Sequence, residues 1–386
     1  MNFEFHIPSA TLYGKGTLKE VAAQASLLRM KNVLIVSDQY LGQSGLVGEV
    51  VKLLEAGGLR AAVFSDVTGE PEIKDVENGL AILRENDCDG VLCIGGGSSI
   101  DTGKAVAVMA KNDGGIADYM GYHRVKNQRL PLIAVPTTAG TGSEMTRVVV
   151  ITDVDRGVKM MCLDNAFMPD AAIVDYSLSI SMPKNLTAFV GLDALTHAIE
   201  AYVSKKAGPV SDMFALLAIR LISADIMNAY NEPDNELARE NMMLGANYAG
   251  IAFSNSSVCA VHGMSRPLGA NFHVPHGLSN AMLLPLITER GIESTHRYAD
   301  VAVSMGYSEL ASRRETALQA VDMLKMLNEK LSIPNLKEYG VLEREYTGLI
   351  PSMVEAAIAS GSPANNPKEF TADEMCEMYE KAYDYK

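Results

Sequence analysis

The length, composition and charge of the chain exclude several classes of protein. It has 386 residues, of which 48% are hydrophobic and 21% charged, the balance of a globular protein long enough for two domains. Its formal net charge of −14 argues against nucleic acid as a partner, because phosphate binding needs a clustered basic surface. Without a long apolar run or the regions of a signal peptide, we expect a cytoplasmic protein with no membrane span. The five cysteines lack metal-type spacing and are expected to be reduced.

The first half of the chain reads as strands that alternate with helices. Short apolar runs predict strands at residues 31–37, 60–64, 90–94, 132–136, 148–151 and 171–174. Helical patterns at residues 46–56 and 72–85 separate the first three strands. This alternation indicates a parallel sheet with crossover helices. Residues 2–14 look extended, as an edge strand or hairpin that could form a dimer contact.

Three glycines and a serine follow the strand at residues 90–94. Gly95, Gly96, Gly97 and Ser98 lead into a predicted helix. Glycine allows a sharp turn and a close approach to a ligand, and the amide N–H groups at the start of a helix favour an anion such as a pyrophosphate. The run is not the G-x-G-x-x-G fingerprint, so an ordinary turn is the alternative.

Further residues in this half favour a dinucleotide. Asp38 follows the first strand, where a carboxylate could bind ribose hydroxyls and would favour NAD over NADP; a helix or turn cap is the alternative. A loop rich in small residues follows the strand at residues 132–136, and its hydroxyl groups belong to Thr137, Thr138, Thr141 and Ser143. Ligands gather at the carboxyl ends of strands in open α/β sheets, so this loop is predicted to line a cofactor cleft, with a plain turn as the alternative. Lys159 could reach a phosphate or ribose, or be solvated.

Beyond Pro183 the pattern changes to helices. Helical periodicity is clearest at residues 212–230, 236–252, 314–331 and 347–359. We therefore predict an α/β dinucleotide-binding domain with a parallel sheet at residues 1–183 and an all-α domain that binds a metal at residues 184–386. The cleft between two such domains is where metal and nicotinamide would meet.

The helical half carries a cluster of potential metal ligands. Asp193 and His197 lie four residues apart in an apolar helical segment, so their side chains share one face. Four of the seven histidines fall in this part of the chain, namely His197, His262, His273 and His276. One carboxylate with three imidazoles suits a borderline divalent ion such as Fe2+ or Zn2+. A satisfied core pair is the alternative for Asp193 and His197.

With these motifs the chain resembles the iron-containing (group III, metal-dependent) alcohol dehydrogenases over essentially its whole length. The resemblance is carried by the segments Gly95–Ser98, Pro136–Glu144, Gly191–His197 and Pro275–Gly277. It implies a divalent ion, between an NAD-binding domain and a helical domain, held by Asp193, His197, His262 and His276. It implies that the dinucleotide is contacted by Asp38, Gly95, Gly96, Gly97, Ser98, Thr137, Thr138, Thr141 and Lys159. Members of this family are commonly homodimers or larger assemblies.

One departure from the family pattern bears on the substrate. Many members have a histidine four residues after the third ligand, where this chain has Arg266. Arginine stays charged and cannot shuttle protons, so His273 is the better candidate for proton relay or substrate contact. In the pocket, Arg266 would pair with a carboxylate, sulfonate or phosphonate, with Arg147 as a second clamp; a local ion pair outside the pocket is the alternative.

These features together predict an NAD(H)-dependent and metal-dependent alcohol dehydrogenase or aldehyde reductase. Its substrate is expected to be a small anionic aldehyde such as sulfoacetaldehyde or succinate semialdehyde. A general primary-alcohol or diol dehydrogenase is the first alternative. A dehydroquinate-synthase-like lyase, which also combines NAD with a metal, and a non-catalytic NAD-binding protein are the others.

Overall fold

The computed structural model describes residues 4–386, which fall into two compact units. One unit comprises residues 6–179, and the other comprises residues 180–386 together with the preceding residues 4 and 5. The ring of Phe5 stacks on that of Phe214, with 6.0 Å between the centroids. This contact explains why the beginning of the described chain groups with the helical unit.

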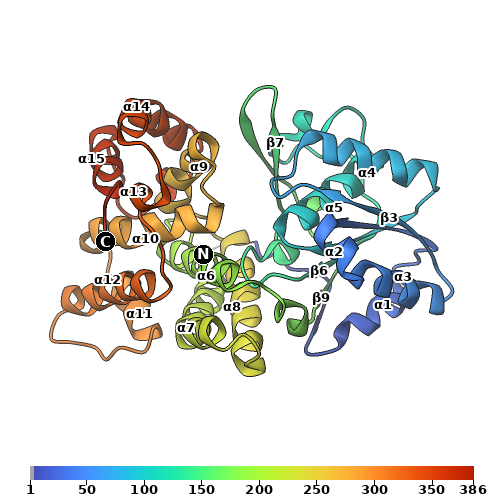
Figure 1. Ribbon diagram of the computed structural model, residues 1–386, viewed down its shortest axis with the longest axis horizontal. Helices are drawn as coiled ribbons and strands as arrows, with labels where there is room; N and C mark the ends of the chain where they lie inside the picture. The colour runs from blue at the N-terminus through green and yellow to red at the C-terminus, as the bar shows by residue number, and fades with distance from the viewer. Residues whose placement is uncertain (1–3) are drawn as a thin grey trace. The chain divides into compact units, whose positions relative to one another are not determined.

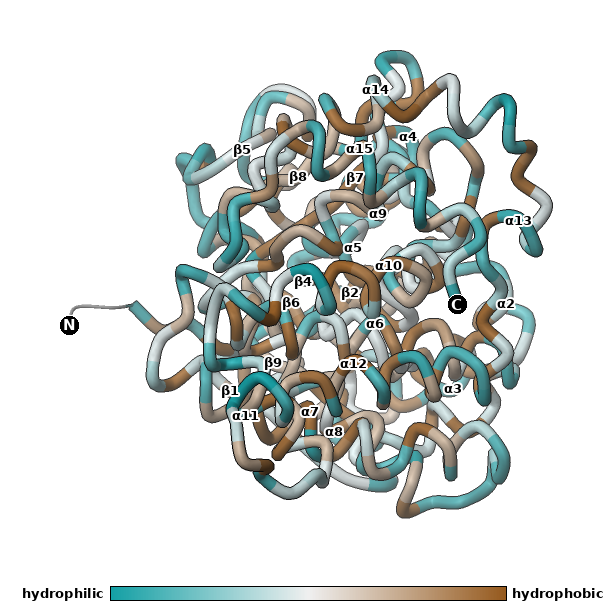
Figure 2. The backbone as a smooth tube through the Cα atoms, turned by 90° about the vertical axis from the view of Figure 1, so that its left-hand side faces the viewer, coloured by the Kyte–Doolittle hydropathy of each residue, from teal (hydrophilic) through white to brown (hydrophobic). Residues whose placement is uncertain are grey.

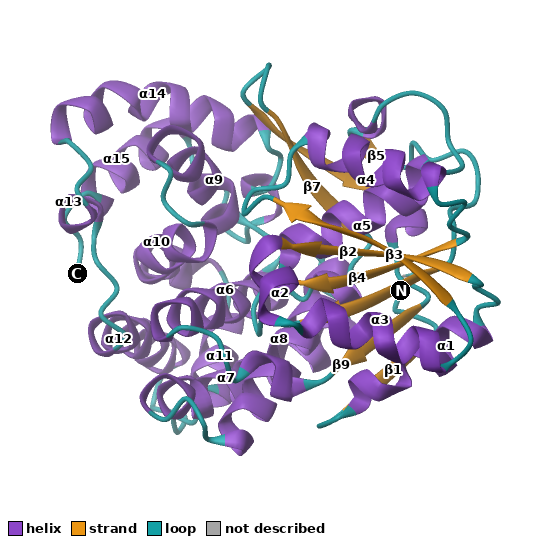
Figure 3. Ribbon diagram, turned by 45° about the vertical axis from the view of Figure 1, so that its right-hand side comes forward, coloured by secondary structure: helices purple, strands orange, loops and turns teal. Residues whose placement is uncertain are grey.

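The predicted parallel sheet forms the frame of the first unit. It has six strands in the order β1-β9-β6-β4-β2-β3. Its strands are β1 (Ala10–Tyr13), β2 (Asn32–Asp38), β3 (Arg60–Val67), β4 (Gly90–Gly95), β6 (Leu132–Pro136) and β9 (Ala171–Val174). The helices of this unit are α1 (Val21–Leu27), α2 (Gln39–Ser44), α3 (Leu46–Ala56), α4 (Ile73–Glu85) and α5 (Gly97–Met109). Figure 3 shows the strands together with these helices.

Two apolar clusters pack against opposite faces of the sheet, because successive side chains of a strand point to opposite sides. Leu34 and Val36 of β2 belong to a cluster with residues of α4 and α5. Val33 and Ile35 belong to another cluster with residues of α1 and α3. Burial on both faces explains the continuous apolar run of β2. Figure 2 colours hydrophobic residues of the backbone brown. Each such fully buried side chain contributes roughly 1.5–3 kcal/mol.

A second sheet of three strands, which the sequence reading did not predict, has the order β5-β8-β7. Its strands are β5 (Gly121–Tyr122), β7 (Val148–Asp153) and β8 (Val158–Leu163). The strand predicted at residues 148–151 forms within β7, but it pairs with β8 as an antiparallel hairpin. Only alternate residues of β7 are buried, the pattern of a sheet with one packed face.

The second unit is helical, and within residues 180–386 the structure contains no strand. Its helices, shown in Figure 1, are α6 (Lys184–Val203), α7 (Pro209–Asn231), α8 (Glu236–Ser254), α9 (Ala260–Phe272), α10 (His276–Gly291), α11 (Arg297–Ser304), α12 (Arg313–Lys330), α13 (Leu336–Tyr339), α14 (Glu343–Ala359) and α15 (Ala372–Ala382). Helix α6 packs against α7, α8 and α10 and is buried on all sides along its second half. Of the helices described, none has the length and apolar character needed to cross a bilayer.

Candidate metal centre and cofactor loops

One face of the buried helix α6 carries three ionisable side chains. Asp193, His197 and Glu200 are spaced by four and three residues, so they lie on the same side of the helix, and all three are buried. His262 comes from the first turn of α9 and His276 is the first residue of α10. Three helices therefore supply the side chains of one site, all within the helical unit.

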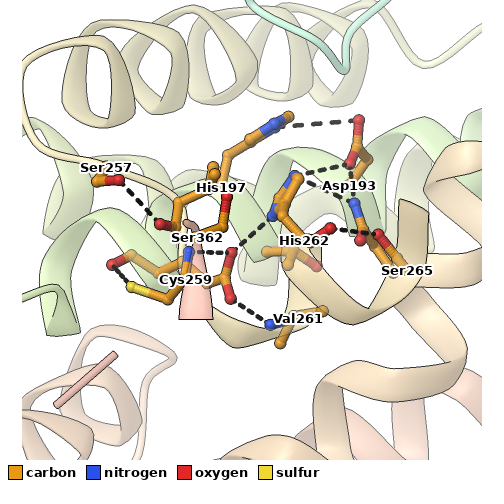
Figure 4. Close-up of polar contacts among 12 residues, drawn as sticks. Asp193, His197, Ser257, Cys259, Val261, His262, Ser265 and Ser362 are labelled. Carbon is orange, nitrogen blue, oxygen red and sulfur yellow. Dashed lines mark hydrogen bonds and ion pairs between the residues drawn. The ribbon is translucent and has the colours of Figure 1, made fainter. Parts of the chain in front are cut away.

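Three of the four predicted ligands bring their ligand atoms together. One atom each of Asp193, His262 and His276 lies within 4.8 Å of the other two. Oδ1 of Asp193 is 3.7 Å from Nε2 of His262 and 3.7 Å from Nε2 of His276. The fourth predicted ligand, His197, lies beside this group, with Nδ1 at 4.0 Å from Oδ2 of Asp193 and its ring stacked on His262. Figure 4 shows Asp193, His197 and His262 facing one another.

The side-chain amide of Asn280, one turn along α10 from His276, shows that the site has more acceptors than donors. Its Nδ2 lies 2.7 Å from Asp193 Oδ1, 3.1 Å from His262 Nε2 and 3.3 Å from His276 Nε2. An amide has two N–H groups and cannot satisfy three acceptors. Among the described residues, Nδ1 of His197 and Oδ1 of Asn280 are also buried without a hydrogen-bond partner. Asp193 and His262 are buried, whereas the side chain of His276 is 41% exposed. Unpaired buried acceptors need positive charge, so these residues fit a divalent ion bound by carboxylate and imidazole groups.

The buried charges of the cluster shift one another's protonation equilibria. Burial opposes ionisation of Asp193, but the rings of His197 and His276 outweigh it and lower the pKa of this carboxyl group. Burial lowers the pKa of His197 to about 3. Burial also disfavours protonation of His262, but the carboxylates of Asp193 and Glu200 raise its pKa. Metal ligation requires an ionised Asp193 and neutral imidazoles. The shifts at Asp193 and His197 favour these states, whereas the shift at His262 favours a protonated ring, whose second proton an ion would displace.

A glycine after His276 lets the start of α10 approach α6. A Cβ atom at Gly277 would lie 2.4 Å from the carbonyl oxygen of Phe189 and 3.3 Å from Cβ of Asp193. The first distance is a clash with backbone, so only glycine allows this approach. His276 thereby reaches Asp193 without a second side chain between the helices.

In the sheet unit, the two predicted cofactor loops lie against each other. The amide N–H of Thr137 donates to the carbonyl oxygen of Gly95 at 3.0 Å. A Cβ atom at Gly97 would lie 2.8 Å from Cγ2 of Thr141, and one at Gly96 would lie 3.5 Å from Cγ2 of Thr138. Gly95 has a φ of 149°, which side chains rarely adopt. The loops after β4 and β6 therefore form one surface at the carboxyl edge of the sheet, beside the start of α5.

Asp38 ends β2 at the same edge. Its Oδ1 accepts from the backbone N–H of Leu41 and caps α2, so the cap interpretation holds for one oxygen. Its Oδ2 would lie 3.4 Å from a Cβ atom at Gly95, which places the other oxygen against the glycine loop. The ribose contact predicted for Asp38 is compatible with both contacts.

Two other predicted cofactor residues contact the loop after β3. The hydroxyl of Ser98 donates to the carbonyl oxygen of Gly69 at 2.6 Å. Lys159 forms an ion pair of 2.7 Å with the neighbouring Glu70. Ser143 differs from the rest, because its buried hydroxyl donates to Asp101 and accepts from Lys104. It connects the threonine loop to α5, and its hydroxyl already has partners within the protein.

The residues predicted to contact substrate have local partners. Arg266 lies four residues after His262 on α9, and its Nη1 donates to Oγ of Ser362 at 3.2 Å. His273 is exposed and ends α9 with a φ of 54°. Arg147 contacts Oδ1 of Asn165 at 3.0 Å. Arg266 therefore shares a helix face with a predicted ligand, whereas Arg147 belongs to the sheet unit.

Sequence reading missed two polar residues of the centre, Glu200 and Asn280. Each had a local signal, because Glu200 is seven residues after Asp193 and Asn280 is four residues after His276. Such spacings place a residue on the helix face of a ligand. They do not show which partner that residue meets.

Comparison with known proteins gives the same assignment over both units. The family described as iron-containing alcohol dehydrogenase matches residues 8–176, and its C-terminal part matches residues 187–383. Alcohol dehydrogenase 4 of Saccharomyces cerevisiae strain YJM789 is 38% identical over 385 residues, covering 99% of this chain and 98% of the relative.

Two solved structures extend the comparison to the fold. A 1,3-propanediol oxidoreductase has a TM-score of 0.96 at 34% identity and covers 99% of this chain and 100% of its own. A sulfoacetaldehyde reductase from Bifidobacterium kashiwanohense, solved with NAD+, has a TM-score of 0.89 at 30% identity and covers 100% of both chains. The family and fold predicted from the motifs are thus confirmed. The chain belongs to the iron-containing alcohol dehydrogenase family and is an alcohol dehydrogenase.

Proposed function

We propose that this enzyme interconverts a primary alcohol and its aldehyde with NAD(H) and one divalent ion, Fe2+ or Zn2+. The observation that carries the proposal is the convergence of the ligand atoms of Asp193 and His262, which are buried, with those of His276, which is exposed, at a site with unpaired buried acceptors. Its relatives support the reaction class, since they are named alcohol dehydrogenase, 1,3-propanediol oxidoreductase and sulfoacetaldehyde reductase. The last of these was solved with NAD+.

The residues of the chain have distinct tasks in this proposal. When bound, the ion supplies Lewis acidity at the carbonyl oxygen and the nicotinamide supplies hydride transfer. Asp193, His197, His262 and His276 would hold the ion. The loops that contain Gly95–Ser98 and Thr137–Thr141 would bind the dinucleotide, and the N–H groups at the start of α5 would suit its pyrophosphate.

The remaining tasks concern the ribose and the proton. Asp38 accepts hydrogen bonds from ribose hydroxyls and disfavours a 2′-phosphate. His273 exchanges the alcohol proton with solvent.

The substrate in this proposal is a small anionic aldehyde such as sulfoacetaldehyde. Arg266 lies one helical turn from His262 and keeps its charge at all working pH values. A guanidinium recognises a sulfonate or carboxylate through two parallel hydrogen bonds. A neutral alcohol or diol is the second candidate, favoured by the 1,3-propanediol oxidoreductase among the similar structures.

NADH oxidation by the Zn2+- or Fe2+-loaded enzyme tests both substrates. Sulfoacetaldehyde is compared with propionaldehyde, which is small and neutral. Arg266→His is expected to lower kcat/KM for the anionic aldehyde by roughly 10–100-fold, the value of a charged hydrogen bond, and to leave the neutral aldehyde nearly unchanged. Arg220→His, at an exposed arginine of α7, is the matched control.

Each other outcome has a definite meaning. An equal loss for both aldehydes removes Arg266 from substrate recognition and favours the neutral alcohol. Turnover that persists in a fully metal-free preparation contradicts the metal mechanism. NADH that is not oxidised with either aldehyde reopens the lyase alternative.

A further inference from the structure

The buried carboxylate of Glu200 faces three N–H donors from the start of α9. Its Oε2 lies 2.6 Å from Nδ1 of His262 and 2.8 Å from the backbone nitrogen of Cys259. Its Oε1 accepts from the backbone N–H of Val261 at 2.6 Å. Figure 4 shows these contacts as dashed lines that meet at one carboxylate. Only 2% of Glu200 is exposed, so these donors replace water as its partners.

This arrangement decides which nitrogen of His262 carries the proton. A carboxylate only accepts hydrogen bonds, so Nδ1 of His262 must be the protonated nitrogen. In the neutral imidazole, Nε2 then presents its lone pair toward Oδ1 of Asp193 and Nε2 of His276, each of which belongs to the cluster. A hydrogen bond at the far nitrogen fixes both the tautomer and the ring orientation of a ligating histidine.

The same carboxylate joins two of the helices that supply ligands. Glu200 is on the face of α6 that carries Asp193 and His197, and it binds the first backbone N–H groups of α9. Unpaired N–H groups at a helix start are stabilised by a negative charge. Helix α9 is therefore held in register with α6 at the turn that contains His262.

We propose that Glu200 is a positioning residue that assembles the metal centre by holding His262 in its ligating tautomer. This inference rests on the metal centre of the proposed function, and Glu200 acts through His262 without touching the ion. A carboxylate is required because it has two acceptor oxygens for the three donors. An amide in its place has one acceptor oxygen and adds an N–H group that faces another donor.

Zn2+ affinity, measured by competition with a chromophoric chelator, tests the proposal without relying on catalysis. Glu200→Gln is expected to raise the Kd for Zn2+ by roughly 10–100-fold. Glu200→Asp keeps the charge at a shorter reach and is expected to cause a smaller loss. Tyr202→Phe on the same helix removes a hydroxyl bound to Asp300 at 2.8 Å and is expected to leave the Kd unchanged.

A double-mutant cycle separates positioning from a merely structural role. In a His262→Ala background, Glu200→Gln is expected to change the Kd by less than about two-fold, because its partner is gone. If Glu200→Gln raises the Kd for Zn2+ by the same factor in the unaltered and in the His262→Ala protein, the proposal is overturned. A lower melting temperature of the metal-free protein with an unchanged Kd overturns it as well. If the unaltered protein binds neither Zn2+ nor Fe2+, the proposed function itself fails.

Discussion

Removing the buried ammonium group of Lys104 should destabilise the sheet unit strongly. Lys104 is fully buried on α5, and its Nζ donates to Ser143 Oγ at 2.8 Å, Thr146 Oγ1 at 2.9 Å and the carbonyl oxygen of Val148 at 3.1 Å. The carboxylate of Asp101 lies 3.9 Å away. Without Lys104, the Asp101 carboxylate would keep its hydrogen bonds from Ser143 and Val150 but would lose the neighbouring positive charge.

Breaking a buried ion pair from one side costs about 3–5 kcal/mol. We therefore expect Lys104→Met to lower the free energy of unfolding by about that amount. Adding Asp101→Asn should restore part of the loss. The new amide can accept from the backbone N–H of Val150, which now donates to Asp101 at 2.8 Å, and can donate to the Ser143 hydroxyl that has lost its lysine.

Urea denaturation of the single and double variants measures these values. The reasoning is refuted if Lys104→Met costs less than about 1 kcal/mol, the typical effect of an average substitution. It is also refuted if the double variant is less stable than Lys104→Met alone. Either result would mean that the buried charge is compensated by groups other than Lys104.

Two further predictions concern the glycine loop and the thiols. Gly97→Ala should weaken NAD+ binding measured by calorimetry, because the added Cβ atom would lie 2.8 Å from Thr141 Cγ2. A second change, Thr141→Ser, removes that methyl group and should restore part of the affinity. The control Gly115→Ala, at a glycine with open space around it, should leave the affinity unchanged. Iodoacetamide at pH 8 should label Cys376 before the four buried cysteines, as mass spectrometry can show. Burial raises the pKa of Cys93 to about 12, which leaves about one thiol in ten thousand ionised; rapid labelling of Cys93 would contradict this account.

The parallel character of the sheet was predictable because it follows from local patterns, whereas its strand order was not predicted. Apolar runs such as that of β2 can be buried on both faces only between layers of helices, which requires parallel strands with crossovers. The β7–β8 hairpin was missed as a separate sheet for a physical reason. Its strands alternate buried and half-buried residues, and nothing in a single sequence shows that their packed face lies on α5 and not in the main sheet.

Within the candidate site, the spacing of Asp193 and His197 could be interpreted locally, because helix geometry places positions four apart on one face. His262 and His276 are distant in the chain, and their role as ligands was predicted from the family resemblance. Ser143 was predicted to contact the cofactor because it lies in a hydroxyl-rich loop, and in the structure its hydroxyl binds Asp101 and Lys104. The direction in which a loop side chain points depends on tertiary packing, which no local pattern encodes.

Glu200 shows why the support of a site is harder to predict than its ligands. Its spacing from Asp193 is visible, but its partner His262 is 62 residues away, and a glutamate on an apolar helix can pair with many groups. What distinguishes it is the coincidence of one histidine and two backbone N–H groups at a single carboxylate. Backbone donors have no sequence signature, since every residue except proline carries one. A positioning residue that acts through backbone donors therefore becomes recognisable only once the helices are placed in space.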